Sequence, residues 1–412
     1  MQTDRLEVFA AAVRGGPVRI CEKGRTMMND WQKEFRALFP NCEKRVYLEA
    51  AVQNGGCTVV EEAVHGFFEE YYAGIMNGKQ QWNGAADETR GLIAELLGGV
   101  SPKHIAFTKN TVEGLNMIAQ GFPWQEGDNV VIAGIEHSSN VFPWLMLKSR
   151  GVEVRMVDAV DDRLPAEVYA RAMDERTRIV AVSHVQAPNG YMHDLKELAD
   201  LCHSRGARLV VDAIQSLGMV PFDAPGWGVD AVVSGCHKNL LAVPGVGFMY
   251  LRPEFLRTIR PVFAGASAAM DIDKKDWTVR CRDEEDARKF EMSNLSYAAI
   301  YSLRAGLKLV TGIGIERIRG HVMPLSDRIN RGLRDIGYYV ATPEDRAHRS
   351  NINSVIVPDL AGMRQWFIER GVWISKMDAG YIRFSLGGFS NDSDVDAALE
   401  KAEEYYASCI DR

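Results

Sequence analysis

The sequence contains few of the features that mark a membrane or secreted protein. No stretch approaches the roughly 18 apolar residues needed to cross a bilayer, and no lysine-rich flank precedes the short apolar stretch at 8–13. The seven cysteines are an odd number and include no C-x-x-C pair, so a disulfide framework is not indicated. We therefore expect reduced thiols and a cytoplasmic location.

Excess positive charge and dinucleotide-binding glycines are also missing. The chain has 48 Lys and Arg against 55 Asp and Glu, a formal charge of −7, so neither nucleic acid nor a membrane surface is expected as a partner. No predicted strand is followed by G-x-G-x-x-G, and Gly245-x-Gly247 leads into a strand rather than a helix, which disfavours a nicotinamide-dependent dehydrogenase. A small molecule of another kind is the expected ligand.

What the sequence does contain is an alternation of strand-like and helix-like segments. Short β-rich runs occur at 104–108, 130–136, 152–158, 178–185, 208–214, 231–236 and 246–251. Most are separated by segments of helical character, such as 112–120, 140–149 and 194–205. This alternation predicts an α/β fold with a mostly parallel sheet and helices on both faces.

The flanking regions predict a second, smaller unit. At this length a hydrophobic core is expected to divide. Residues 254–290 are irregular and charge-rich, and from Tyr297 onward helical and strand patterns alternate. We expect an N-terminal segment over 1–60 that packs on the small domain, a large ligand-binding domain over 61–290, and a small α+β C-terminal domain over 291–412.

Polar side chains stand where several predicted strands end, which is where ligands bind in open α/β sheets. Asn110 and Glu113 form a capping-box-like helix start whose free N–H groups suit a phosphate, although a plain capped helix explains them as well. His137 follows the next strand, where its flat ring could stack on a flat cofactor or merely cap the loop.

Asp212 and Lys238 end neighbouring strand-length segments and carry the strongest signal. A carboxylate at the end of an apolar strand needs a cation or strong donor, and a protonated pyridine nitrogen is one such partner, an arginine another. A lysine beside a cation such as His237 can lose its proton and act as nucleophile or base. Together they match what pyridoxal 5'-phosphate needs, one group for the pyridinium and one for the aldehyde carbon.

These residues lie in motifs that follow one another across residues 45–400. The motifs are Tyr47–Ala51, Asn110–Glu113, Glu136–Asn140, Ser183–Gln186, Asp212–Gln215, Ser234–Lys238, Phe290–Asn294 and Ile382–Ser385. In this order they resemble the class V aminotransferase family, which includes cysteine desulfurases and isopenicillin N epimerase-like enzymes. The resemblance implies the fold-type I architecture of transferases that depend on pyridoxal 5'-phosphate.

The resemblance also implies a role for each matching residue. The catalytic set comprises Lys238, which would hold the cofactor as a Schiff base, Asp212, which would pair with the pyridine nitrogen, and His137, which would stack on the ring. The other cofactor-binding residues are Gln215 at the ring 3-oxygen, Asn110, Thr111, Ser234 and His237 at the phosphate, Gln186, and Ser293 with Asn294. The last two would reach the neighbouring subunit's phosphate, which implies a homodimer with shared active sites.

For an amino-acid substrate, the resemblance implies that Arg383 would clamp the carboxylate with its bidentate fork. Ala51 and Asn189 are the other substrate-binding candidates, and no metal site is expected.

Two departures from the family's pattern matter. Desulfurases carry a nucleophilic cysteine on a loop shortly before this arginine, whereas the stretch 370–383 contains none, and the family's Gly-Thr turn reads Met292-Ser293.

The stretch 136–144 matches the desulfurase branch best. We therefore predict a lyase that breaks a C–S bond by β-elimination without a catalytic cysteine. Aminotransfer and epimerisation are the alternatives within the family. A catalytically silent binding or regulatory protein with the same fold is the alternative from another class.

Overall fold

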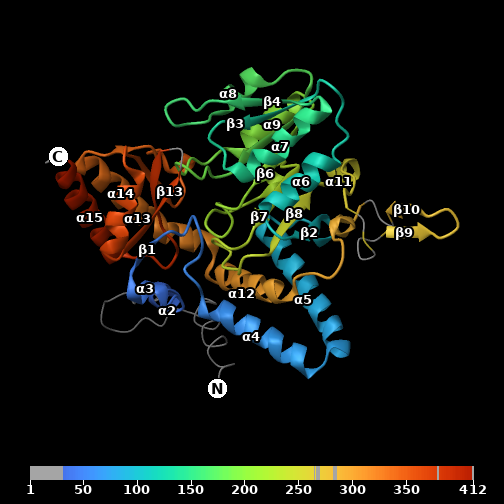
Figure 1. The fold of residues 1–412 in the computed structure, drawn as a ribbon, viewed down its shortest axis with the longest axis horizontal. Helices are drawn as coiled ribbons and strands as arrows, with labels where there is room; N and C mark the ends of the chain where they lie inside the picture. Colours follow the sequence, from blue (N-terminus) through green and yellow to red (C-terminus); the bar gives the residue numbers. More distant parts are fainter. Residues whose placement is uncertain (1–30, 264, 266–269, 282–284, 378–379, 411–412) are drawn as a thin grey trace, which may run out of the picture.

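The computed structural model describes residues 31–263, 265, 270–281, 285–377 and 380–410, and a seven-stranded sheet lies at its centre (Figure 1). The sheet order is β2-β8-β7-β6-β5-β3-β4. The strands are β2 (Ile105–Thr108), β3 (Asn129–Ala133), β4 (Glu153–Val157), β5 (Thr177–Ser183), β6 (Arg208–Asp212), β7 (Ala231–Gly235) and β8 (Gly247–Leu251). Only β8 runs antiparallel to its neighbours in this sheet, so the predicted mostly parallel α/β arrangement is confirmed.

The sheet is buried on both faces, as the apolar runs predicted. In β6, Val210 packs into one hydrophobic cluster, while Leu209 and Val211 on the opposite face pack into another. Helices α6 (Thr111–Gly121) and α9 (Leu195–Ser204) contribute to different clusters and therefore cover opposite faces. The sheet is left open to ligands only at its strand ends.

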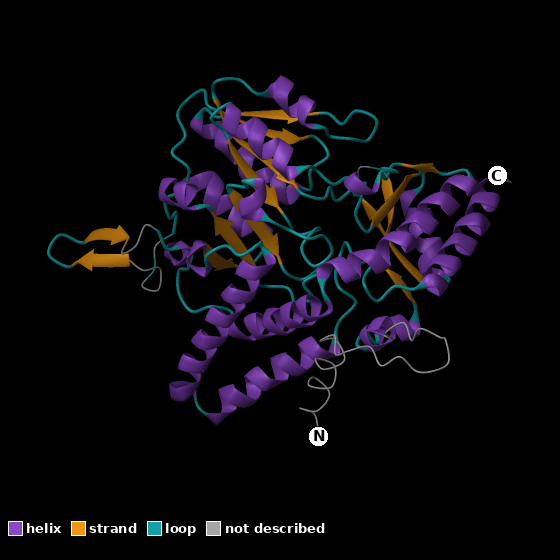
Figure 2. Ribbon diagram, turned by 180° about the vertical axis from the view of Figure 1, so that it is seen from behind, coloured by secondary structure: helices purple, strands orange, loops and turns teal. Residues whose placement is uncertain are grey.

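A second sheet combines an N-terminal strand with the C-terminal part of the chain. Its order is β1-β13-β14-β12-β11. The strands are β1 (Val46–Leu48), β11 (Tyr339–Val340), β12 (Ile352–Ile356), β13 (Val372–Met377) and β14 (Tyr381–Ser385). Helices α13 (Ile315–Ile336), α14 (Leu360–Glu369) and α15 (Asp392–Ile410) lie against it (Figure 2).

Because β1 pairs with β13, part of the 1–60 segment joins the C-terminal sheet. Residues 1–30 lie outside the described part of the chain, and the domain boundaries stay a prediction.

Three helices pack against one another along the lower side of the molecule in Figure 1: α4 (Thr58–Ala73), α5 (Ile75–Leu96) and α12 (Tyr297–Ile313). None of the described helices alone is long and apolar enough to cross a bilayer. Helices α12 and α13 reach such a length only as a pair, and that pair is bent by 76°.

Several segments differ from the sequence-based prediction. The predicted helix at 140–149 consists of three short turns, η2 (Ser138–Asn140), α7 (Phe142–Leu145) and η3 (Met146–Arg150), with Pro143 in the first turn of α7. The region 254–290, predicted to be irregular, contains an antiparallel hairpin that projects from the body (Figure 1). The remaining elements are α2 (Trp31–Ala37), α3 (Asn41–Lys44), α8 (Ala166–Ala172), α10 (Ala224–Trp227), α11 (Pro253–Thr258), β9 (Met270–Asp273), β10 (Thr278–Cys281), η1 (Pro102–His104), η4 (Ala287–Phe290) and η5 (Arg346–His348).

Two buried histidines beyond β5 predict acid sensitivity. Burial, with added repulsion from neighbouring cationic groups, lowers the pKa of His184 to about 3 and that of His193 to about 4. Both values lie below the ordinary pKa of an unfolded histidine, so below about pH 6.5 the unfolded chain binds more protons than the folded one. The free energy of unfolding should therefore fall as pH drops, by roughly 2–4 kcal/mol between pH 7 and pH 5.

Urea denaturation at the two pH values measures this loss. The variant His184→Phe keeps ring packing against Phe222 and Trp227 but cannot be protonated, and the Nδ1 that it removes has no hydrogen-bond partner among the described residues. About half of the pH dependence should disappear in the variant. An identical pH dependence in both proteins would contradict the assignment.

Candidate active site

Asp212 and Lys238 stand at the same edge of the large sheet. The register pairs Ser183 on β5 with Asp212 on β6, and Asp212 with Val233 on β7, so these strands end together. Asp212 is buried, and its Oδ1 accepts a hydrogen bond of 3.0 Å from the Ile214 N–H. Lys238 follows β7 after a short turn.

Burial shifts both groups toward their neutral forms. It lowers the pKa of the Lys238 ammonium and raises that of the Asp212 carboxyl, while attraction between the two groups opposes each shift. The carboxylate therefore lies in a site that lacks a full counter-charge. A ligand that binds to the lysine nitrogen and presents a cation to Asp212 would remove this imbalance, and pyridoxal phosphate has both properties. The residues present thus fit the cofactor.

His137 presents its ring to the same edge. The residue is exposed, and its Nδ1 accepts from the Ser139 N–H at 3.2 Å and lies 2.8 Å from the Ser139 Oγ. Desolvation lowers the pKa of the imidazole, and the charges of Lys238 and Arg383 lower it further. The ring is therefore neutral and oriented, which suits stacking on a flat cofactor.

Arg383 reaches this edge from β14 of the other sheet. Its Nε donates to the Ser375 Oγ at 3.1 Å and its Nη1 to the Ala187 carbonyl at 3.0 Å. Burial lowers the pKa of the guanidinium to about 10, an effect that Glu49 opposes. Because its charge also acts on Lys238, the arginine shares the site with the lysine and can meet an anionic group there.

The start of α6 lies beside the end of β7. Asn110 caps the helix by accepting from the Glu113 N–H at 2.9 Å, as predicted, while the Glu113 carboxylate accepts from the Lys109 N–H at 2.6 Å. Thr111 is buried, and its Oγ1 accepts from the Gly235 N–H at 2.8 Å. The N-terminus of an 11-residue helix is thereby held next to the turn that carries Lys238.

The turn around Lys238 is itself tied down. Ser234 is fully buried, and its Oγ donates to the Gly235 carbonyl at 2.7 Å. The His237 carbonyl accepts from both the backbone N–H and the side-chain amide of Asn54. Burial lowers the pKa of His237, and the neighbouring Lys238 lowers it further. These contacts fix the lysine's position from an N-terminal segment far away in the sequence.

Comparison with known proteins shows the family. The family model for aminotransferase class V matches residues 46–397. The chain belongs to aminotransferase class V. This membership confirms that the protein is an enzyme and that its cofactor is pyridoxal phosphate.

Relatives and solved structures agree with this assignment. The chain is 31% identical to a probable cysteine desulfurase of Methanothermobacter thermautotrophicus over 74% of this chain and 76% of that protein. It is 29% identical to an uncharacterized protein of Schizosaccharomyces pombe over 88% of this chain and 85% of that protein. A cysteine desulfurase from Thermococcus onnurineus superposes with a TM-score of 0.84 at 23% identity, covering 91% of this chain and 98% of that one. The fold-type I architecture is therefore confirmed.

In this class V enzyme, Gln215 and Ala51 join the two sheets near the site. The Gln215 side-chain amide donates to the Ala51 carbonyl at 3.0 Å, and the Ala51 N–H donates to the Ser385 Oγ at 3.0 Å. All three residues are buried. Their predicted contacts with the cofactor ring and the substrate stay predictions.

Gln186 and Asn189 lie in the loop after β5. Gln186 is fully buried and donates to Glu136 at 2.7 Å, and its Oε1 has no hydrogen-bond partner among the described residues. The Asn189 amide donates to the Asp162 carbonyl at 2.8 Å and accepts from the Tyr191 N–H at 3.0 Å. These contacts make Asn189 part of the loop's own scaffold, and its predicted contact with substrate has no support from them.

Ser293 and Asn294 lie away from Lys238 in this chain. Both side chains are exposed and line a surface pocket with Lys109 and Gly245. Exposure is what the predicted contact with a neighbouring subunit requires, and that contact stays a prediction.

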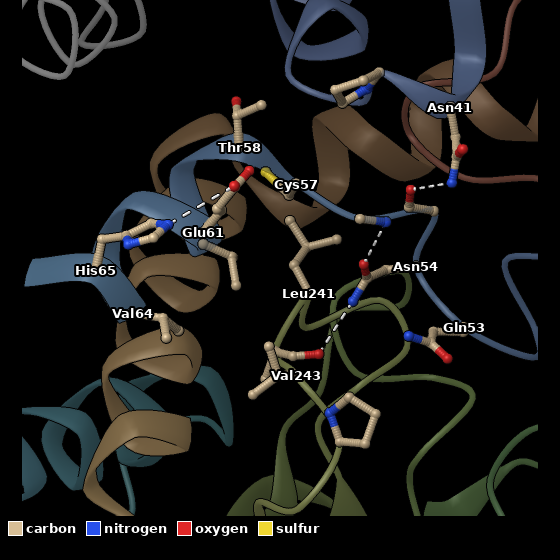
Figure 3. Close-up of a pocket in the computed structure, with 16 residues that line it drawn as sticks. Asn41, Gln53, Asn54, Cys57, Thr58, Glu61, Val64, His65, Leu241 and Val243 are labelled. Atoms are coloured by element: carbon tan, nitrogen blue, oxygen red, sulfur yellow. Dashed lines mark hydrogen bonds and ion pairs between the residues drawn. The ribbon is translucent and has the colours of Figure 1, made fainter. Parts of the chain in front are cut away.

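A larger pocket of about 430 Å³ lies beside the segment that follows Lys238 in the sequence (Figure 3). Cys57 and the first turns of α4 line one side, and the segment Leu241–Pro244 lines the other. Asn54 and Leu241 line both this pocket and a small cavity that Lys238 borders. Leu241 has φ +65°, a conformation that is unusual for a bulky residue and marks a strained turn next to the lysine.

The sequence analysis did not assign a role to the residues that hydrogen-bond to the predicted site residues. Glu136 accepts from Gln186, Ser375 accepts from Arg383, and Asn54 donates to the lysine turn. Of these, only Glu136 gave a signal, because a carboxylate follows an apolar strand there just as at Asp212. The Asn54 contact joins segments far apart in the sequence, and the Ser375 contact crosses from one strand of a hairpin to the other.

Proposed function

We propose that this protein is a lyase that breaks a C–S bond of a sulfur-containing amino acid by β-elimination, without a catalytic cysteine. The observation that carries the proposal is the short connection between β13 and β14. Met377 pairs directly with Tyr381, and the Gly380 N–H donates to the Met377 carbonyl at 3.1 Å. Only three residues, none of them a cysteine, separate Met377 from Tyr381 in the sequence just before Arg383, where desulfurases carry a cysteine on a loop.

In this proposal each side chain has a defined task. When bound, pyridoxal phosphate would supply an acceptor for the electron pair that Cα of the substrate releases. Lys238 holds the cofactor and, once freed, moves the proton at Cα, which its lowered pKa favours because the neutral amine is the base. Asp212 keeps a proton on the ring nitrogen. Arg383 binds the substrate carboxylate with the guanidinium edge that Ser375 and Ala187 leave free.

The known relatives permit this reaction without requiring it. One fold neighbour, with a TM-score of 0.82 and 22% identity, is the cystine C–S lyase C-DES in complex with its reaction product cysteine persulfide. Other relatives are a cysteine desulfurase and an uncharacterized aminotransferase. We further propose a cytoplasmic homodimer in which Ser293 and Asn294 reach the partner's phosphate site.

A panel of amino acids tests the reaction class. The protein, loaded with pyridoxal phosphate, is mixed with L-cysteine, L-cystine, L-alanine and L-aspartate while pyruvate, ammonia and cofactor absorbance are followed. We expect pyruvate and ammonia from a sulfur amino acid, and none from L-alanine, which has no leaving group. Conversion of the cofactor to its amine form would establish aminotransfer instead, and loss of optical purity would establish epimerisation. No turnover of any compound would favour the silent binding protein.

The cysteines nearest to the site should be dispensable. Burial raises the pKa of Cys57 to about 11 and raises that of Cys236 well above its ordinary value, so neither is a thiolate near neutral pH. Both side chains are buried. Cys57→Ser and Cys236→Ser should each keep turnover within about tenfold of the unmodified enzyme, a barrier change near 1.4 kcal/mol. A larger loss together with a persulfide trapped on either residue would restore the desulfurase mechanism.

A further inference from the structure

Glu136 is a buried carboxylate directly before His137 in the loop after β3. It accepts three hydrogen bonds from the neighbouring strand end and loop. Its Oε1 accepts from the Ser183 N–H and the Gln186 side-chain amide, both at 2.7 Å, and its Oε2 accepts from the Ser183 Oγ at 2.5 Å. A carboxylate that is buried away from water is stable only with such donors, so the loss of these contacts is expected to be strongly destabilising.

One branch of this network fixes the loop that carries His137. Because Glu136 and His137 are adjacent, holding the carboxylate on Ser183 also holds the backbone from which the imidazole projects. The imidazole has few other restraints, since among the described residues it hydrogen-bonds only to Ser139 within the same loop. The direction of the ring therefore depends on where Glu136 is anchored.

The other branch leads to Arg383. Gln186, held by Glu136, is followed by Ala187, whose carbonyl accepts from the Arg383 Nη1 at 3.0 Å. The next residue, Pro188, accepts from the Ser354 Oγ at 2.6 Å on β12, which pairs with β14. The turn at 186–188 thus connects the anchored carboxylate to the arginine on the second sheet.

We infer that Glu136 is a positioning residue that sets His137 and Arg383 in one common geometry. The imidazole of His137, proposed to stack on the cofactor, and the guanidinium of Arg383, proposed to bind the substrate carboxylate, are both aligned through the buried Glu136 carboxylate. This inference rests on the proposed function, because it assigns the substrate carboxylate to Arg383. It adds a residue that touches neither cofactor nor substrate.

Glu136→Ala should disturb both branches in the protein loaded with pyridoxal phosphate. We expect visible circular dichroism of the bound cofactor to fall by more than about half, and the dissociation constant for L-alanine to rise about tenfold or more, since small misplacements at such sites have large effects. Glu136→Gln should restore both, because glutamine is isosteric: its Oε1 can still accept from the Ser183 N–H and the Gln186 amide, and its Nε2 can donate to the Ser183 Oγ. A failed rescue by glutamine would count against positioning by hydrogen bonds.

Gln186→Leu and Asp230→Asn complete the test. Gln186→Leu cuts the branch to Arg383 and leaves the Ser183 contacts of Glu136 in place, so it should weaken L-alanine binding more strongly than it lowers the circular dichroism. Asp230 is also buried and accepts from Leu209 and His203 at the opposite strand ends, so Asp230→Asn should lower the melting temperature alone. If Glu136→Ala or Gln186→Leu behaves like Asp230→Asn, the inference is wrong. Absence of any spectral response to L-alanine in the unmodified enzyme would instead overturn the proposed function.

Discussion

Replacing Lys238 by alanine should abolish turnover and leave pyridoxal phosphate bound only noncovalently. Lys238 is the lysine whose charge acts on Asp212, and burial keeps part of it as the neutral amine that can attach the cofactor. Loss of a residue that serves both as attachment point and as base should lower the rate by at least about 10³-fold. Added pyridoxal phosphate should still bind, because α6, Asp212 and His137 are untouched.

Intact-mass measurement after borohydride reduction checks this prediction. The unmodified enzyme should gain the mass of one reduced cofactor, and Lys238→Ala should gain none. Lys196→Ala is a suitable control, because Lys196 lies exposed on α9 and pairs only with Asp200. A reduced cofactor on the Lys238→Ala protein would place the attachment point on another lysine.

Arg383→Lys should weaken substrate binding far more than cofactor binding. The guanidinium uses Nε and Nη1 to hold Ser375 and Ala187, and a lysine ammonium cannot keep these contacts while also binding a carboxylate with two parallel hydrogen bonds. The expected loss is about 2–4 kcal/mol, by analogy with breaking a desolvated, hydrogen-bonded charge pair. This corresponds to an increase in KM of roughly 30- to 1,000-fold.

Parallel titrations of amino acid and of pyridoxal phosphate measure the two affinities. Arg370→Lys provides the same chemical change outside the site, since Arg370 follows α14 and packs over Trp366. It should leave both affinities unchanged. If Arg383→Lys lost the cofactor while amino-acid affinity stayed the same, Arg383 would belong to the phosphate site.

The centre of the fold could be predicted because buried parallel strands give continuous apolar runs. Those runs placed Asp212 and Lys238 at strand ends, and the structure brings both to one edge of the sheet. The predicted strand over 208–214 ends two residues earlier, at Asp212, so the carboxylate stands at the very end of the strand. Local patterns also gave the Asn110 cap, because both partners lie within one helical turn.

Other features depend on contacts between distant segments and left no local signal. Arg383 lies on a different sheet from Lys238, and only the family resemblance connected them. The hairpin of β9 and β10 is a different case, because each strand alternates apolar and polar residues, but over only four positions within a charge-rich stretch. Desolvation, which shifts the pKa values of Lys238 and Asp212, depends on the packing of the whole fold.

The mass of the protein during turnover, measured together with the pyruvate formed, tests the central claim most directly. The enzyme is mixed with its best sulfur amino acid, stopped at several times, and both quantities are followed in the same samples. Direct β-elimination predicts pyruvate in equal amount to the sulfur product and a protein whose mass never includes an added sulfur atom. A protein that carries one extra sulfur on a cysteine, with alanine formed in place of pyruvate, would contradict the account.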